Sequence, residues 1–149
     1  TVDTANAEFW RKLADDTYVL LAKYQSAMGG LVPEWSNVDG STDGGYSYNA
    51  CRTPWRIATD YQWFCTPEAK SFLEPVVTYV DGKGGVASVP FDKNSAFLGA
   101  FALSAVATTQ TKLDGYVDAW LGAKMDDTPY FQGTLRVLYL QTAAGKFTP

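Results

Sequence analysis

Apolar residues recur at helical spacing in six stretches of the chain, and almost no stretch shows the alternation typical of a β-strand. The predicted helices cover residues 4–26, 48–64, 67–80, 94–106, 109–124 and 129–144. Consecutive helices are joined by connectors, and no sequence repeat is detectable. The pattern therefore predicts an all-α fold of three stacked helical hairpins, forming a single unit over residues 1–149.

Capping residues, glycine and proline mark the helix ends. Asp3 or Thr4 can cap the first helix, Thr66 opens the third, and residues 126–129 cap the last. Pro75 should kink or tighten the third helix. The positions of the first helix that should face the core are Trp10, Leu13, Thr17, Leu20, Leu21 and Tyr24.

The connectors carry turn signals. Residues 31–35 (LVPEW) should be extended, because Pro33 disfavours a helical conformation at the residue before it. Residues 36–45 (SNVDGSTDGG) contain Asp-Gly twice, which predicts a loop. Residues 81–90 predict a turn followed by a short extended piece.

Residues 46–64, YSYNACRTPWRIATDYQWF, form the stretch around which the chain is organised. On a helix of 3.6 residues per turn they give a polar stripe, while the other faces are apolar. The stripe consists of Asn49, Thr53, Arg56 and Asp60, with Arg52 and Trp63 at its edges. A helix that is apolar nearly all round is normally buried, so the stripe should face a pocket. The alternative is a surface helix with an Arg56–Asp60 pair at i, i+4.

Charge and residue types exclude several classes of function. A net charge of −4 disfavours binding to nucleic acid or to an anionic membrane surface. No apolar run approaches the roughly 20 residues that span a bilayer. Histidine is absent, which excludes Ser-His-Asp and Cys-His catalysis and the usual zinc sites. Any chemistry must use carboxylates, Tyr, Lys or Cys, and we expect no metal and no cofactor.

The cysteines, Cys51 and Cys65, both fall in or next to the central helix. On a continuous helix their Cα atoms would lie about 21 Å apart. A disulfide needs Cα atoms within about 7 Å, so we predict two free thiols.

Three segments carry a family resemblance: LVPEW after a Gly-Gly helix end, the central stretch, and YFQGTLRVLYLQTAAGKF at the chain end. In this order and spacing they resemble the C-terminal part of glycoside hydrolase family 8, bacterial endo-acting enzymes on cellulose, chitosan or xylan. The family fold is an (α/α)6 barrel, with six inner helices ringed by six outer ones. The resemblance implies about half of such a barrel and a secreted or periplasmic location.

The resemblance also implies inverting hydrolysis of a β-1,4-linked polysaccharide, with a cellulose-type glucan as first choice and chitosan or xylan as alternatives. An inverting glycosidase needs two carboxylates far enough apart to admit a water. The family's general acid is a Glu of the N-terminal half, which has no counterpart in these residues. We therefore expect an N-terminal half of the same enzyme as partner, and no activity from this chain alone.

Asn49 stands where many family members have an Asp that acts as general base. An amide is neutral and cannot take a proton from water at any useful pH. Three explanations stay open. The base can come from the acidic loop upstream, with Asp43 or Asp39 as candidates; Asn49 can be an engineered change; or the lineage has lost activity and kept sugar binding.

The resemblance assigns roles to other residues. Arg52 matches an arginine that orients the base and the water, and Tyr48 matches an aromatic near the cleaved bond. Tyr130 and Phe131 match aromatics that line the cleft. Glu34, in LVPEW, is interpreted as a structural anchor of the loop.

Two other functions remain open. One is a catalytically silent module that binds glycans, and the other is a helical interaction module in which the polar stripe is fully packed without a cleft. In every case we interpret Trp55, Arg56 and Asp60 as structural residues that hold the central helix against its neighbours.

Overall fold

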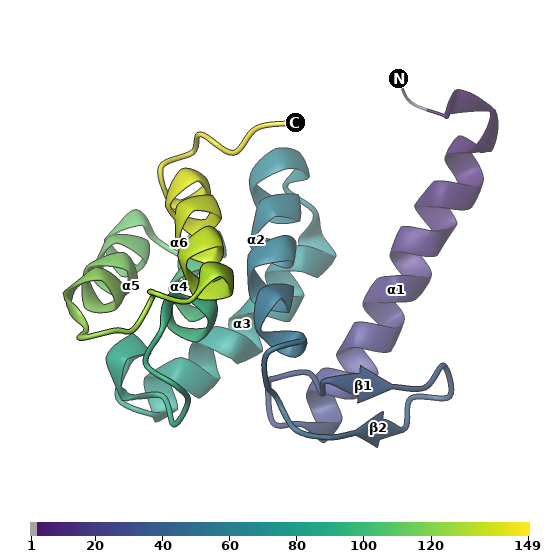
Figure 1. Ribbon diagram of the computed structural model, residues 1–149. Coiled ribbons are helices and arrows are strands. Elements are labelled where there is room, and N and C mark those ends of the chain that lie inside the picture. Colours follow the sequence, from purple (N-terminus) through teal and green to yellow (C-terminus); the bar gives the residue numbers. More distant parts are fainter. Residues whose placement is uncertain (1–2) are drawn as a thin grey trace.

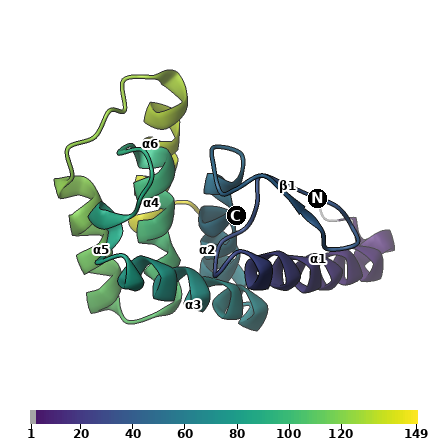
Figure 2. The same ribbon diagram turned by 90° about the horizontal axis from the view of Figure 1, so that it is seen from below.

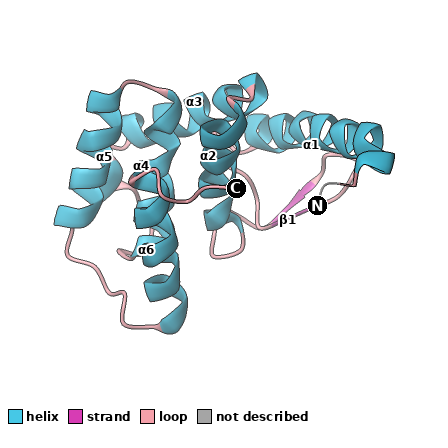
Figure 3. Ribbon diagram, turned by 90° about the horizontal axis from the view of Figure 1, so that it is seen from above, coloured by secondary structure: helices cyan, strands magenta, loops and turns pink. Residues whose placement is uncertain are grey.

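The computed structural model describes residues 3–149, which form six α-helices, short 3₁₀ segments and one pair of strands (Figures 1 and 3). The α-helices are α1 Ala7–Ala27, α2 Thr53–Phe64, α3 Pro67–Gly82, α4 Ser95–Leu103, α5 Gln110–Gly122 and α6 Tyr130–Ala143. The 3₁₀ segments are η1 Thr4–Asn6, η2 Ala50–Arg52, η3 Val86–Ser88 and η4 Ser104–Ala107. The all-α prediction and its six helices are confirmed.

Helix α4 is the centre of the fold, and all of its residues are buried. It contacts α2, α5 and α6 directly (Figure 1). A Cβ atom at Gly99 would lie 2.5 Å from Cδ2 of Tyr139 and 2.9 Å from Cζ2 of Trp120. Both rings are fully buried, so α5 and α6 can approach α4 this closely only because position 99 has no side chain.

Helix α1 joins the rest of the molecule mainly through α3, which bridges α1 and the cluster of α4, α5 and α6 (Figure 2). The joint lies at the C-terminal end of α1, where the Nε2 group of buried Gln25 donates to the backbone oxygens of Gly30 (2.9 Å) and Phe72 (2.8 Å). The prediction that Trp10, Leu13 and Thr17 face the core is wrong, since all three are exposed, Trp10 by 51% and Leu13 by 46%. Periodicity identified the apolar face correctly, but within residues 3–149 the core covers only its C-terminal part, at Leu20, Leu21 and Tyr24.

The segment after α1 has more structure than the predicted loop. Strand β1 (Trp35–Ser36) pairs antiparallel with β2 (Thr42–Asp43), with Trp35 opposite Asp43. The backbone N–H of Asn37 donates to the Ser41 oxygen at 3.0 Å and tightens the turn. The Tyr24 hydroxyl donates to the Asn37 oxygen at 2.8 Å, which ties this hairpin to α1.

Other predicted details also need correction. The extended piece before residue 90 is the 3₁₀ segment η3, because Val86 and Val89 are both drawn into the core. The Asp3 carboxylate accepts hydrogen bonds from the side chains of Asn6 and Trp10 and does not cap a backbone N–H. The α6 N-cap, Pro129, has no capping side chain.

Helix α2 is attached to the end of the chain by long-range hydrogen bonds. Trp55 Nε1 donates to Thr142 Oγ1 at 2.8 Å, and Gln62 Nε2 donates to the Thr142 backbone oxygen at 3.0 Å. Trp63 Nε1 donates to the Phe147 oxygen at 2.6 Å, and the two rings are stacked. The structural interpretation of Trp55 is confirmed.

The central stretch differs from a regular buried helix. It begins with the 3₁₀ segment η2 before α2 starts at Thr53, and most of α2 is only half-buried. The Arg56–Asp60 pair is not formed, because Asp60 instead accepts the Tyr18 hydroxyl of α1 at 2.6 Å. Cys51 is buried, Cys65 is exposed, and both thiols are free as predicted.

No helix within residues 3–149 is both long enough and apolar enough to cross a bilayer.

Candidate functional site

An open pocket of about 430 Å³ lies at the N-terminal end of α2. Its lining residues are Tyr48, Asn49, Arg52, Phe131 and Gln132. The first three come from the segment that leads into α2, and the last two from the first turn of α6. Four of the five were candidates from the sequence. Gln132 was missed, because no local pattern distinguishes it from any other polar residue of α6.

Arg52 connects the two walls of this pocket. Its guanidinium carbon lies 5.7 Å from the centre of the Phe131 ring, a cation–π distance. Its Nη2 atom lies 3.4 Å from the backbone oxygen of Asn49, to which it donates. The 3₁₀ segment η2 places Asn49 and Arg52 one tight turn apart, so both side chains reach the same hollow.

Glu34 is the carboxylate bound to Asn49. Its Oε1 accepts the Asn49 backbone N–H at 2.8 Å, and its Oε2 lies 3.4 Å from the Asn49 Nδ2 that donates to it. The backbone N–H of Glu34 donates to the Gly45 oxygen at 2.8 Å. Glu34 is therefore bound through its backbone to Gly45 and through its side chain to Asn49, at the end of the loop that leads to α2. The interpretation of Glu34 as a loop anchor is confirmed.

Tyr48 is held by hydrogen bonds and by ring contacts. Its hydroxyl donates to Asp92 Oδ2 at 2.7 Å and accepts from Asn94 Nδ2 at 3.0 Å. Its ring meets Phe97 and Phe131 edge-on, with centroid distances of 4.8 and 6.0 Å. Burial, and then the bond to Asp92, raise the pKa of Tyr48, so its hydroxyl remains a donor near neutral pH.

The remaining sequence candidates do not line this pocket. Asp39 and Asp43 lie on the β1–β2 hairpin, and Tyr130 is 86% exposed at the start of α6. Asp39 Oδ1 accepts the Ser41 backbone N–H at 2.8 Å, and the hydrogen bonds from Ser41 lower the Asp39 pKa. A lowered pKa makes a carboxylate a weaker base.

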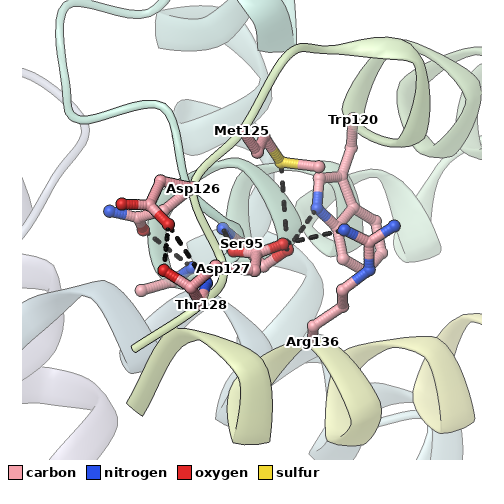
Figure 4. Close-up of polar contacts among 9 residues, drawn as sticks. Ser95, Trp120, Met125, Asp126, Asp127, Thr128 and Arg136 are labelled. Carbon is pink, nitrogen blue, oxygen red and sulfur yellow. Dashed lines mark hydrogen bonds and ion pairs between the residues drawn. The ribbon is translucent and has the colours of Figure 1, made fainter. Parts of the chain in front are cut away.

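A partly buried network fixes the segment that leads to Phe131 (Figure 4). The backbone N–H and the hydroxyl of Ser95 donate to the two carboxylate oxygens of Asp127, both at 2.7 Å. Arg136 Nη1 donates to Asp127 at 2.8 Å, and Trp120 Nε1 donates to the Ser95 hydroxyl at 3.0 Å. The sequence suggested Asp127 as a local cap, but it instead links α4, α6 and the preceding loop.

The pocket therefore offers aromatic rings, one guanidinium and two amides, and no carboxylate lines it. Aromatic faces and neutral hydrogen-bonding groups suit a polyhydroxylated ring. Asn49 cannot act as a base, and both oxygens of Glu34 are engaged with Asn49. Within residues 3–149, no group of three or more acidic or cysteine side chains could hold a metal ion.

Comparisons with known proteins agree with this chemistry. The family described as glycosyl hydrolases family 8 matches residues 2–145. Endoglucanase C of Ruminiclostridium cellulolyticum is 26% identical over 154 residues, which cover 93% of this chain and 34% of that protein. The Beta-glucanase of Niallia circulans is 33% identical over 90 residues, covering 50% of this chain and 22% of that protein.

A solved structure shows the same fold. The apo structure of the Beta-1,3-1,4-glucanase from Paenibacillus sp. X4 superposes with a TM-score of 0.73 at 21% sequence identity. The match covers 93% of this chain and 44% of the other. The helical hairpins thus form about half of an (α/α)6 barrel. The chain spans about a third of the length of the curated relatives it matches.

Proposed function

Because the chain belongs to glycosyl hydrolases family 8, we propose that it forms one half of the catalytic domain of a secreted or periplasmic glycoside hydrolase. The enzyme would cleave β-1,4-linked glucan at internal positions with inversion, and chitosan or xylan are alternative substrates. The general acid would come from an N-terminal half outside these residues. This half would supply one wall of the glycan cleft.

The observation that carries the proposal is the convergence of Tyr48, Asn49, Arg52 and Phe131 on one open pocket. Two segments far apart in the sequence supply these residues, the one that leads into α2 and the first turn of α6, and the family resemblance assigns all four to the cleft. The names of the relatives, among them endoglucanases and a Beta-1,3-1,4-glucanase, support a β-glucan as substrate.

The source of the general base remains part of the proposal. Asp43 and Asp39 lie on the hairpin next to Glu34, and either would have to move towards the pocket to activate a water there. We favour Asp43, since the hydrogen bonds that lower the pKa of Asp39 also occupy its carboxylate. Arg52 would orient the base and the water and would donate a hydrogen bond to a sugar hydroxyl, and Tyr48, Tyr130 and Phe131 would contact the sugar.

The isolated chain should bind cello-oligosaccharides without hydrolysing them. Calorimetry should detect binding, and Arg52→Ala should weaken it about tenfold if one charged hydrogen bond is lost. Arg11→Ala, on the exposed face of α1, is the matched control and should bind normally. Absence of binding would refute a glycan cleft, and reducing sugar released by the isolated chain would refute the need for an external acid.

Native mass spectrometry should then identify the missing half. In material purified from the natural source, the second half would be expected either as a bound polypeptide of comparable mass or as part of one longer chain. With that partner, NMR should detect the α-anomer as first product, because inversion at a β-linked carbon yields it. The β-anomer as first product would contradict inversion.

Asn49 supports a second candidate, a glycan-binding module without catalysis. The position that should hold a base carries an amide, and its neighbour Glu34 is engaged as an anchor. In that case the chain binds the same oligosaccharides but shows no hydrolysis with any partner. The variant Asn49→Asp restores a carboxylate at this position. Measuring the activity of the enzyme reconstituted with this variant distinguishes the two candidates.

A further inference from the structure

A second open pocket, of about 420 Å³, shares Tyr48 with the first. Its lining residues are Tyr46, Ser47, Tyr48, Pro90, Phe91, Asp92 and Phe97. Because Tyr48 lines both hollows, they adjoin along this one ring. Pro90, Phe91 and Asp92, which form one wall of this pocket, had no role predicted from the sequence.

Asp92 is the charged group of this second pocket. Its Oδ2 accepts the Tyr48 hydroxyl at 2.7 Å, and its Oδ1 has no hydrogen-bonding partner within residues 3–149. The side chain is exposed, so Oδ1 is open to a ligand. A carboxylate oxygen is an acceptor and suits the hydroxyl groups of a sugar.

The backbone around Asp92 is fixed by contacts in both directions. Its oxygen accepts the Asn94 N–H at 2.9 Å, and the Lys93 ammonium donates to the Val89 oxygen at 2.5 Å. The Lys93 oxygen accepts the Asp126 N–H at 3.0 Å, so this segment is also tied to the loop before α6. The carboxylate is therefore held in one place before any ligand arrives.

Aromatic rings back this pocket, where Phe91 is half-buried and the rings of Tyr46 and Phe97 are buried. Phe91 stacks on Phe97 with a centroid distance of 5.4 Å and an interplanar angle of 8°. Tyr46 contacts Phe91 at 5.2 Å. A pyranose ring presents C–H groups on its faces and hydroxyls at its edge, so the half-buried ring of Phe91 beside a fixed acceptor matches its chemistry.

We propose that this pocket is a second sugar-ring site, adjoining the one at Arg52, in which Asp92 accepts a hydrogen bond from a hydroxyl of a neutral β-linked oligosaccharide. Tyr48 would stand between the two occupied sites. The inference rests on the proposed function, because it requires that the first pocket also binds sugar. Its alternative is that Asp92 only positions Tyr48 and never touches the ligand.

The test compares the binding of cellobiose and cellotetraose by calorimetry. In the natural sequence the tetrasaccharide should bind more tightly, since it can occupy both pockets. Asp92→Ala should weaken the tetrasaccharide about tenfold, as expected for a lost hydrogen bond to a charged acceptor, and should reduce its advantage over the disaccharide. Asp118→Ala, at an exposed aspartate of α5, is the matched control.

Tyr48→Phe separates direct contact from positioning. This variant removes the hydroxyl whose hydrogen bond Asp92 accepts, but it leaves the ring packed against Phe97 and Phe131. If Asp92 binds sugar directly, Tyr48→Phe should weaken the tetrasaccharide less than Asp92→Ala does. Equal losses in the two variants would overturn the proposal in favour of positioning.

Two further outcomes count against the inference. If Arg52→Ala weakens both sugars while Asp92→Ala weakens neither, the second site is wrong and the proposed function stands. If neither sugar binds to the natural sequence, both proposals are overturned. The thermal unfolding of each variant is also measured by circular dichroism, which distinguishes a variant that has lost its fold from one that has lost a sugar contact.

Discussion

Replacing Gly99 by alanine should destabilise the protein even though alanine is the better helix former. The new Cβ would lie 2.5 Å from the Tyr139 ring and 2.9 Å from the Trp120 ring. Both rings are fully buried, and Trp120 is also held by the hydrogen bond from its indole to Ser95. Neither ring can therefore move away without disturbing α5 or α6.

The expected magnitude follows from two opposing effects. Overpacking a core lowers stability by about 1–3 kcal/mol. Because two immobile rings oppose the new methyl group, the cost of Gly99→Ala should lie at the upper end, about 3 kcal/mol. The gain in helix propensity from Gly to Ala returns about 1 kcal/mol. The free energy of unfolding should fall by about 2 kcal/mol, which lowers Tm by about 4–8 °C in a domain of this size.

Urea denaturation followed by circular dichroism measures this change, with the slope of the transition unchanged if only the folded state is strained. Gly115→Ala on α5 is the matched control. Nothing lies within 4 Å of a Cβ built at Gly115, so that variant should gain up to about 1 kcal/mol. The reasoning is refuted if Gly99→Ala is as stable as the natural sequence or more stable.

Two other features of the core lead to predictions. Asp127→Ala should lower the free energy of unfolding by about 2–3 kcal/mol, because it leaves the backbone N–H and hydroxyl of buried Ser95 and the Arg136 guanidinium without their acceptor, and urea unfolding measures the loss. Asp127→Asn, which keeps one acceptor oxygen, should lose less, and an equal loss would contradict this reading. Burial raises the pKa of the Cys51 thiol to about 12, so at pH 8 it stays protonated and unreactive. Iodoacetamide should then modify exposed Cys65 alone in the folded protein and both thiols in urea, as counted by mass spectrometry; rapid double labelling of the folded protein would contradict the buried position of Cys51.

The sequence predicted those features whose causes lie within a few residues. The Asn94 side chain accepts the Ala96 N–H, and the Thr109 side chain accepts the Lys112 N–H, so both helix starts follow from local capping. The position of Gly at the end of α1 similarly marked where that helix stops.

The sequence could not predict contacts whose partners are distant. Trp10 follows the helical period but remains half-exposed, because periodicity does not tell whether another element covers a face. Asp127 has the local signature of a cap, yet its partner Ser95 lies 32 residues away. The need for glycine at position 99 arises only when α5 and α6 close over α4.

The residues of the candidate site also divide into those that local sequence predicts and those whose partners are distant in the sequence. Tyr48, Asn49 and Arg52 share one turn of chain, so their proximity was predictable from spacing alone. Phe131 was found through the family resemblance. Asp92 gave no signal, because its relation to Tyr48 spans 44 residues and passes through a segment that resembles an ordinary loop.

The hydrogen bonds that attach α2 to the chain's last described segment also bear on how the protein forms during synthesis. The partners of Trp55, Gln62 and Trp63 lie 87, 80 and 84 residues downstream. A ribosome adding about 5–20 residues per second needs about 4–17 seconds to produce them.

During that interval α3 and α4 can already pack against α2, while the side-chain donors of Trp55, Gln62 and Trp63 bind only water. A nascent chain that has not yet reached Phe131 presents the Arg52 guanidinium to solvent. The pocket therefore comes into existence only once α6 has left the ribosome, although the residues that define its first wall were translated long before.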